Sequence, residues 1–173
     1  MNEAITNLLT RRSVRAYTNE PVCRKDLETI VKAGYHAPSG RNLQTWHFTV
    51  VTNPDKLAAL ADAVGKALNR PGYGFYGCPA LIIVTNVTGS SLPGADSACA
   101  LTNMFNAAHA LGLGSVWINQ LNDCCNDPMV RALLTSFGVP ENHIAYGCAA
   151  IGHPAADLPE RAAKNPNVVS WVE

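Results

Sequence analysis

Three arginines and a serine stand close together near the start of the chain, in the run RRSVR at positions 11–15. Guanidinium groups form paired hydrogen bonds that match phosphate oxygens, and a hydroxyl can add another. Neighbouring cations repel one another unless an anion or solvent offsets their charge. One interpretation is a phosphate clamp formed by Arg11, Arg12, Ser13 and Arg15. The other is a solvated basic end of the preceding helix that offsets the helix dipole, and this segment alone leaves both open.

A second polar group lies in a loop before an alternating, strand-like run, within YHAPSGRNLQTWHFTVV at positions 35–51. A plain connection needs only a few such residues. The loop offers many hydrogen-bonding groups on a closely approachable backbone, which would suit a planar polar ligand. Taken alone, it is also consistent with an ordinary polar loop. The residues concerned are Pro38, Ser39, Gly40, Arg41, Asn42 and Gln44.

Several known enzyme motifs are absent or out of context. The run LGLGSVWINQ at positions 111–120 follows a helical pattern and precedes a strand, and Trp117 stands where a dinucleotide fingerprint needs its third glycine. The run IGHP at 151–154 predicts a tight turn in which Gly152 allows a close backbone approach, and His153 is interpreted as a surface histidine. There is no G-x-S-x-G elbow, H-E-x-x-H motif or Walker loop. If the protein is an enzyme, we expect a cofactor to carry the difficult chemistry.

Length and composition limit the classes of protein to consider. The 173 residues fit one domain, residues 1–173. Lys plus Arg and Asp plus Glu both number 13, so no net charge marks a nucleic-acid or membrane partner. Only 15% of residues are charged, which predicts that a subunit interface covers part of the surface. No apolar run approaches the ~18 residues of a membrane span, and the start lacks a signal peptide, so we expect a cytoplasmic protein.

The six cysteines include no C-x-x-C pair. Cys124 and Cys125 are adjacent and too constrained for an easy disulfide. Without a secretory signal, we expect free thiols. A zinc site built from these two cysteines and a distant histidine is a weaker alternative.

Apolar periodicity and capping residues predict a mixed order of elements. Helices are expected over 2–10, 24–36, 54–68, 126–137 and from a cap at Asp96 to Leu111, and strands over 46–52, 80–87, 113–121, 144–151 and 168–172. This order indicates an α+β fold with a central sheet. The helix that follows Asp96 is apolar almost all round, so we expect it to pack on its own sheet and on another subunit. The last strand could pair with the partner's sheet.

Five motifs in this order resemble the nitroreductase family of flavin enzymes: RRSVRAY, APSGRNLQTWHF, FYGCPALIIV, ALGLGSVWI and AIGHP, with a basic residue near the end. They span essentially the whole chain. The resemblance implies a homodimer with FMN at the subunit interface. It also implies a central mixed, mainly antiparallel sheet flanked by helices, with a C-terminal strand exchanged with the partner subunit. Hydride would pass from NADH or NADPH to flavin N5, and then by a ping-pong scheme to a nitroaromatic, quinone or related acceptor.

The same resemblance implies roles for individual residues. Arg11 and Ser13 would hold the FMN phosphate with support from Arg12. Arg15 would lie near flavin N1 and O2, where a cation stabilises the charge that develops on reduction. Gly152 would lie near the phosphate.

The remaining implied residues come from the loop, from one strand and from the end of the chain. Those that would lie against the ring or fix the loop are Pro38, Ser39, Gly40, Asn42 and Gln44, contributed by the other subunit. Those that would run past the reactive side of the flavin are Trp117, Ile118, Asn119 and Gln120. Either Arg161 or Lys164 would close the anion site. Arg41 and Gln120 would face the substrate, and no residue of the chain would itself be catalytic.

The sequence departs from the family pattern at Thr45, where relatives usually have proline, and at Arg41, where many have a small residue. If Arg41 reaches the open flavin face, it would favour anionic acceptors or the NADPH 2′-phosphate. The chain also lacks a long lid insertion. Three alternatives remain: another flavin reaction on the same fold, such as ene reduction, dehalogenation or flavin fragmentation; a non-catalytic module that stores or senses FMN; and a dimer without a cofactor.

Overall fold

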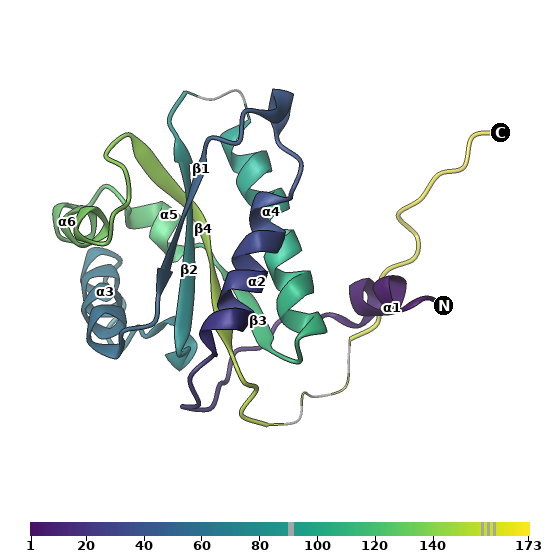
Figure 1. Ribbon diagram of the computed structural model, residues 1–173, viewed down its shortest axis with the longest axis horizontal. Helices are drawn as coiled ribbons and strands as arrows, with labels where there is room; N and C mark the ends of the chain where they lie inside the picture. The colour runs from purple at the N-terminus through teal and green to yellow at the C-terminus, as the bar shows by residue number, and fades with distance from the viewer. Residues whose placement is uncertain (90–91, 157, 159, 161) are drawn as a thin grey trace.

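A computed structural model describes residues 1–89, 92–156, 158, 160 and 162–173 of the chain. Figure 1 shows a central sheet with helices on both faces, and α1 and the C-terminal segment beside this body. In chain order the elements are α1 (Glu3–Thr10), α2 (Arg24–Tyr35), the 3-10 turn η1 (Gly40–Asn42), β1 (Trp46–Val51), α3 (Pro54–Ala67), the 3-10 turn η2 (Phe75–Gly77), β2 (Ala80–Val87), α4 (Pro93–Ala110), β3 (Gly114–Ile118), α5 (Gln120–Cys124), α6 (Pro128–Ser136) and β4 (His143–Gly152).

The sheet has the strand order β1-β2-β4-β3, and every neighbouring pair is antiparallel. A parallel bridge between Ser13 and Ser115 adds a short mixed element at the outer side of β3. The predicted α+β class with a mainly antiparallel central sheet is therefore confirmed. Among the described residues, no strand or bridge pairs with the outer edge of β1.

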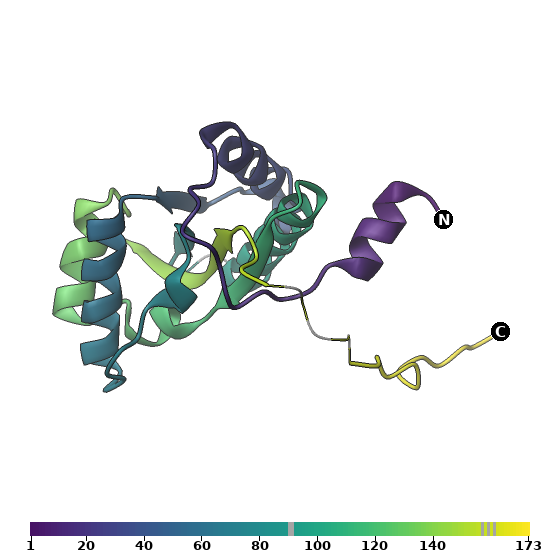
Figure 2. The ribbon, with the colours of Figure 1, turned by 90° about the horizontal axis from the view of Figure 1, so that it is seen from below.

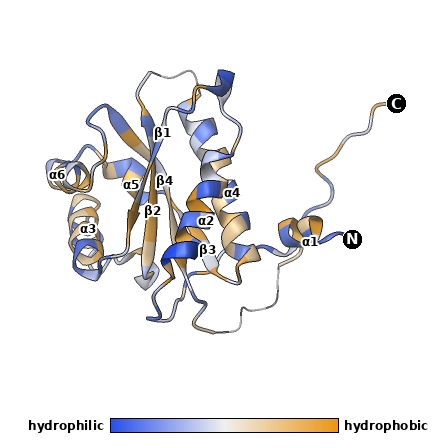
Figure 3. Ribbon diagram, viewed as in Figure 1, coloured by the Kyte–Doolittle hydropathy of each residue, from blue (hydrophilic) through white to orange (hydrophobic). Residues whose placement is uncertain are grey.

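Both faces of the sheet are covered by apolar side chains. Along β2, Leu81 and Ile83 face the core under α3, α5 and α6, whereas Ile82 and Val84 face the core under α2 and α4. This alternation follows from the two-residue period of a strand. Because both faces are buried, β2 is a continuous apolar run, which Figure 3 shows as hydrophobic colour along the strand.

Three predicted element boundaries are wrong, each for a local reason. Helix α4 begins at Pro93, so Asp96 is not the cap but a buried residue of the first turn. The strand predicted over 113–121 ends at Ile118, because Asn119 adopts helical backbone angles (φ −98°, ψ −21°) and α5 follows. The helix predicted from 126 begins at Pro128, where Asp127 accepts backbone hydrogen bonds as the cap.

The two ends of the chain extend from this body. Helix α1 has no buried residue, and side-chain hydrogen bonds join it to α4: Asn7 Nδ2 donates to Asn106 O (2.9 Å), and Thr10 Oγ1 lies 2.9 Å from His109 Nε2. Figure 2 shows α1 and the C-terminal segment on the same side of the molecule.

The strand predicted over 168–172 is absent from the single chain, since the described residues after β4 form no helix or strand. A strand needs a neighbour for its N–H and C=O groups, and no strand or bridge in the described part of the chain pairs with this segment. Its pairing with a partner's sheet stays a prediction. None of the helices in the described part of the chain has the length and apolar character to span a membrane.

Candidate functional site

The arginine-rich segment runs along the outer edge of β3. Val14 N donates to Ser115 O (2.9 Å), beside the parallel bridge between Ser13 and Ser115. The Val14 side chain is buried against Gly114, where a Cβ would lie 2.8 Å from Val14 Cβ. With Val14 anchored inward, alternation directs the side chains of Ser13 and Arg15 outward, and both residues are exposed.

The end of the same segment is fixed beside the end of β4. Tyr17 bridges Pro154, and Thr18 N donates to His153 O (2.9 Å). Tyr17 Oη lies 2.7 Å from Val14 O and 3.2 Å from Ala150 O, so its hydroxyl hydrogen serves these two carbonyls. Burial raises the pKa of Tyr17, which keeps this donor protonated. Residues 11–18 thus form a strap across one end of the sheet.

Close packing around Gly152 leaves no room for a side chain at this position. A Cβ at this position would lie 2.6 Å from Pro79 Cδ and 2.8 Å from Tyr17 Cδ1. Because Gly152 pairs with Gly114 across β4 and β3, the pairing brings three of the sequence motifs together at one end of the sheet. His153 lies beside the strap, 3.9 Å from Glu20 and with about a third of its side chain exposed (34%).

The arginines of the strap have no carboxylate partner among the described residues. Within the described part of the chain, Arg11, Arg12 and Arg15 form no ion pair. Arg15 is exposed, and Arg11 and Arg12 are half-buried. This donor set fits a phosphate group, because guanidinium groups without carboxylate partners form their strongest hydrogen bonds with an anion.

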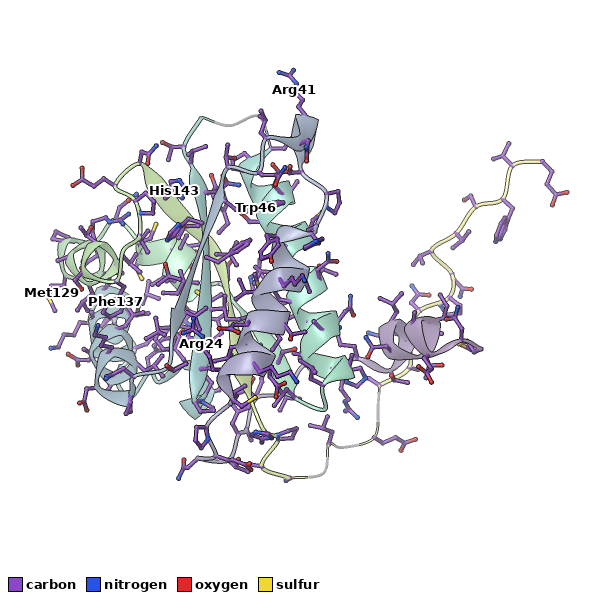
Figure 4. All side chains as sticks on the ribbon, in the orientation of Figure 1. Arg24, Arg41, Trp46, Met129, Phe137 and His143 are labelled. Atoms are coloured by element: carbon purple, nitrogen blue, oxygen red, sulfur yellow. The ribbon has the colours of Figure 1, made fainter. Side chains whose placement is uncertain are left out.

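The polar loop lies at the opposite end of the sheet from the strap. Figure 1 shows η1 at the top of the molecule, and Figure 4 shows Arg41 pointing away from the body. Arg41, Asn42 and Gln44 all adopt positive φ angles, of 54°, 56° and 50°. Left-handed backbone is unfavourable for residues with a Cβ, so other contacts must hold this loop.

Those contacts come from within the loop and from α4. Gln44 N donates to Ser39 Oγ (3.2 Å), and Gln44 Nε2 donates to Asn42 Oδ1 (2.9 Å). Gly40 N donates to Asp96 Oδ1 (2.8 Å), and the Asp96 residue is only 4% exposed. Sequence reasoning assigned Asp96 to a helix cap and missed this function. The available signal was a carboxylate in an otherwise apolar helix.

The residues at the end of β3 divide by accessibility. Trp117 is 37% exposed, and its ring lies over Gly147 and 6.3 Å from the Phe105 ring. Ile118 is buried in the core, so only its backbone could face a ligand. Asn119 is exposed and donates to Asp123 Oδ1 (3.4 Å), while Gln120 is half-buried at the start of α5.

The basic residues near the end of the chain are not placed at the strap by any described contact. Lys164 is exposed, and its side chain makes no hydrogen bond or ion pair in the described part of the chain. Arg161 lies outside the described residues. Neither the loop at positions 38–44 nor Lys164 is therefore joined to the strap within one chain.

The cysteines do not form a reactive centre. All six are free, and Cys78, Cys124, Cys125 and Cys148 are buried. Burial raises the pKa of Cys78 and of Cys124 to about 11, so both thiols are protonated and weakly nucleophilic near neutral pH. No three His, Cys, Asp or Glu side chains of the described residues are grouped as metal ligands, so Cys124 and Cys125 lack the further ligand that a zinc site needs.

Comparisons with known proteins relate this chain to nitroreductases and flavin reductases. The model of the nitroreductase family matches residues 8–74 and 67–153. An FMN reductase [NAD(P)H] of Bacillus subtilis is 32% identical, over 97% of this chain and 71% of its own. An NADPH-flavin oxidoreductase of Vibrio harveyi is 32% identical, over 89% of this chain and 67% of its own. The crystal structure of a nitroreductase with bound FMN from Bacteroides fragilis superposes with a TM-score of 0.95 at 42% identity, over 100% of both chains.

Proposed function

The chain belongs to the nitroreductase family, and on this premise we propose that it is an FMN-dependent NAD(P)H oxidoreductase that works as a homodimer. The observation that carries the proposal is the strap, which presents three arginines and Ser13 at one end of the sheet, with no carboxylate partner in the part of the chain that the structure describes. The FMN phosphate brings about two negative charges, which this cluster would offset. The FMN-bound structure of the Bacteroides fragilis nitroreductase supports the same choice of cofactor.

Each part of the strap would have a separate task toward FMN. Arg11 and Ser13 would hold the phosphate, with Arg12 beside them. Arg15 would lie near N1 and O2 of the ring, where a fixed cation favours the reduced, anionic form. When bound, FMN supplies the hydride chemistry between NAD(P)H and an acceptor such as a nitroaromatic or a quinone. The chain therefore needs no acid or base of its own at the reacting atoms.

A homodimer is proposed because one chain holds the two halves of the candidate site far apart. The strap and the loop at positions 38–44 lie at opposite ends of the same sheet (Figure 1). A second copy would supply its loop beside the strap of the first. Helix α1, which has no buried residue, and the apolar side chains of residues 168–172 offer surface for such an interface.

Measurements of flavin binding, oligomeric state and turnover test the proposal. Absorbance of the purified protein, together with titration of the apoprotein with FMN, measures flavin binding, and size-exclusion chromatography measures the oligomeric state. Steady-state oxidation of NADH and NADPH with nitrofurazone or a quinone then measures turnover. We expect a yellow dimer that oxidises at least one of the two nucleotides. A colourless monomer that binds no FMN would refute the proposal, and an FMN-bound dimer without turnover would indicate a storage module instead.

A further inference from the structure

An apolar cavity of about 1050 Å³ opens between α3 and the loop that joins α3 to β2. Its apolar lining includes Pro54, Leu57, Ala58, Tyr73, Phe75 and Pro79. The Tyr73 and Phe75 rings meet edge to face at 5.0 Å. The cavity lies on α3, away from η1, and Asn19 and Pro21, which come just after the strap, line part of it. None of the residues proposed to hold FMN lines it.

The wall of this cavity is held in place by the chain itself. Arg70 N donates to Gly65 O (2.7 Å), which ties the loop to the end of α3. Phe75 and Tyr76 adopt positive φ angles of 48° and 60°, and the Phe75 side chain is buried. Residues keep such unfavourable backbone conformations only where the surrounding structure holds them in place. The cavity is therefore formed before any occupant binds.

The last residues of the chain present large apolar side chains without cover. Val168 is 74% exposed, Val169 59%, Trp171 86% and Val172 97%. A run of this kind is a candidate for burial against another surface. Figure 1 shows the C-terminus on the opposite side of the molecule from α3, so the segment does not reach the cavity of its own chain in this conformation.

We infer that Trp171 of a second copy of this chain seats in the α3 cavity. The inference rests on the proposed homodimer and adds the site where the end of one chain binds the other. An indole ring suits a cavity with proline, leucine and aromatic walls, because aromatic side chains bury a large apolar area with little loss of conformational freedom.

Charge complementarity supports this occupant. In an extended segment Trp171 and Glu173 lie on one face, about 7 Å apart. Lys66 and Arg70 both line the cavity, where they could meet the Glu173 carboxylate. Asp62 also lines it and pairs with Lys66 (2.7 Å). Arg70 has no ion-pair partner in the part of the chain that the structure describes.

The position of the cavity also agrees with the predicted strand exchange. Thr52 and Pro54 line the cavity and come just after the end of β1 at Val51. The outer edge of β1 pairs with no strand in the described residues, and Val51 at its end faces the core on the α3 side. A strand from a second copy that paired with this edge in the parallel direction would end at the cavity and bring Trp171 to it.

Crosslinking between two differently tagged chains tests the inference. Both chains carry Cys23→Ser and Cys99→Ser, since Cys23 is exposed and Cys99 is half-buried, whereas the other four cysteines are buried. One also carries Ser170→Cys, beside the indole, and the other Ala58→Cys, in the cavity wall. The FMN-loaded mixture is treated with a short bismaleimide. The matched control replaces Ala58→Cys by Ala59→Cys, which is also exposed but lies about 100° around α3, outside the lining.

We expect hetero-crosslinks to form about tenfold faster at position 58 than at 59, because docking raises the local concentration of the two thiols. Adding Trp171→Ala to the Ser170→Cys chain should remove this preference. An FMN-bound dimer with equal rates at both positions would overturn the inference and leave the proposed function intact. Crosslinks that form only when both cysteines are in one chain would overturn the inference, because the cavity would then bind the C-terminal segment of its own chain. A monomer would refute both.

Discussion

Replacing Asp96 by alanine tests how the polar loop is held. Asp96 lies in the first turn of α4, is 4% exposed and accepts a hydrogen bond from Gly40 N at 2.8 Å. It does not belong to the strap. Its proposed effect on FMN therefore acts through the loop that a partner subunit would place against the flavin.

The expected magnitude follows from the charge on this hydrogen bond. A hydrogen bond to an ionised group contributes about 1.5–3 kcal/mol. Arg41, Asn42 and Gln44 each adopt a left-handed conformation that costs about 1–2 kcal/mol for most residues, so the loop has a strong tendency to relax once the bond is lost. If only a fraction of the relaxed loops are competent to bind, the apparent affinity for FMN falls to that fraction of its original value. We expect Asp96→Ala to weaken FMN binding about tenfold or more, which corresponds to about 1.4 kcal/mol.

Fluorescence titration of the apoprotein with FMN measures this change, at a temperature well below the melting transition of each variant. Asp96→Asn keeps an oxygen acceptor for Gly40 N and should restore most of the affinity. Asp55→Ala, an exposed carboxylate in the first turn of α3, is the control. If Asp96→Ala binds FMN as well as Asp55→Ala does, the argument that Asp96 holds the loop is wrong.

Three further predictions follow from the strap and from the buried thiols. Arg15→Ala should weaken FMN binding about tenfold or more in the same titration, and Lys56→Ala should not; equal losses would contradict the role of Arg15. Gly114→Ala should lower the free energy of unfolding in urea by about 1–3 kcal/mol because its Cβ meets Val14, whereas Gly74→Ala, with open space around it, should change it less. Burial raises the pKa of Cys78 from 9.0 to about 11, so the folded state binds this proton more tightly and unfolding should become easier as pH rises from 9 to 11; a urea midpoint that does not fall over this range would contradict it.

The sequence predicted the sheet and its covering helices where burial and caps leave a local signature. The strand over Ala80–Val87 was predicted at its observed bounds, because an uninterrupted apolar, β-branched run is what a strand buried on both faces requires. Asn53 was predicted as a helix cap, and its Oδ1 accepts from Lys56 N at 3.0 Å. Both features depend only on neighbours in the chain.

Features that depend on contacts between residues far apart in the sequence could not be predicted in the same way. Asp96 looks like a helix cap by residue type, but its partner is Gly40, which is 56 positions away. Residues 168–172 have strand-like composition, but a strand forms only beside another strand, and none of the described strands pairs with this segment. The α5 helix replaces the end of a predicted strand because Leu121 and Cys124 reach the core at helical spacing.

The glycines of the LGLGSVWI and IGHP motifs affect both the packing of the strap and the position of its arginines. Neither Gly114 nor Gly152 is needed here for a dinucleotide turn. Gly114 admits Val14, and Gly152 admits Tyr17, so both hold the strap against the sheet. With Val14 and Tyr17 anchored in this way, Arg15 and Ala16 between them are both exposed, so the Arg15 side chain lies in solvent. The two small residues thus determine where the cations lie, and a larger residue at either position would displace the proposed phosphate site without removing any of its arginines.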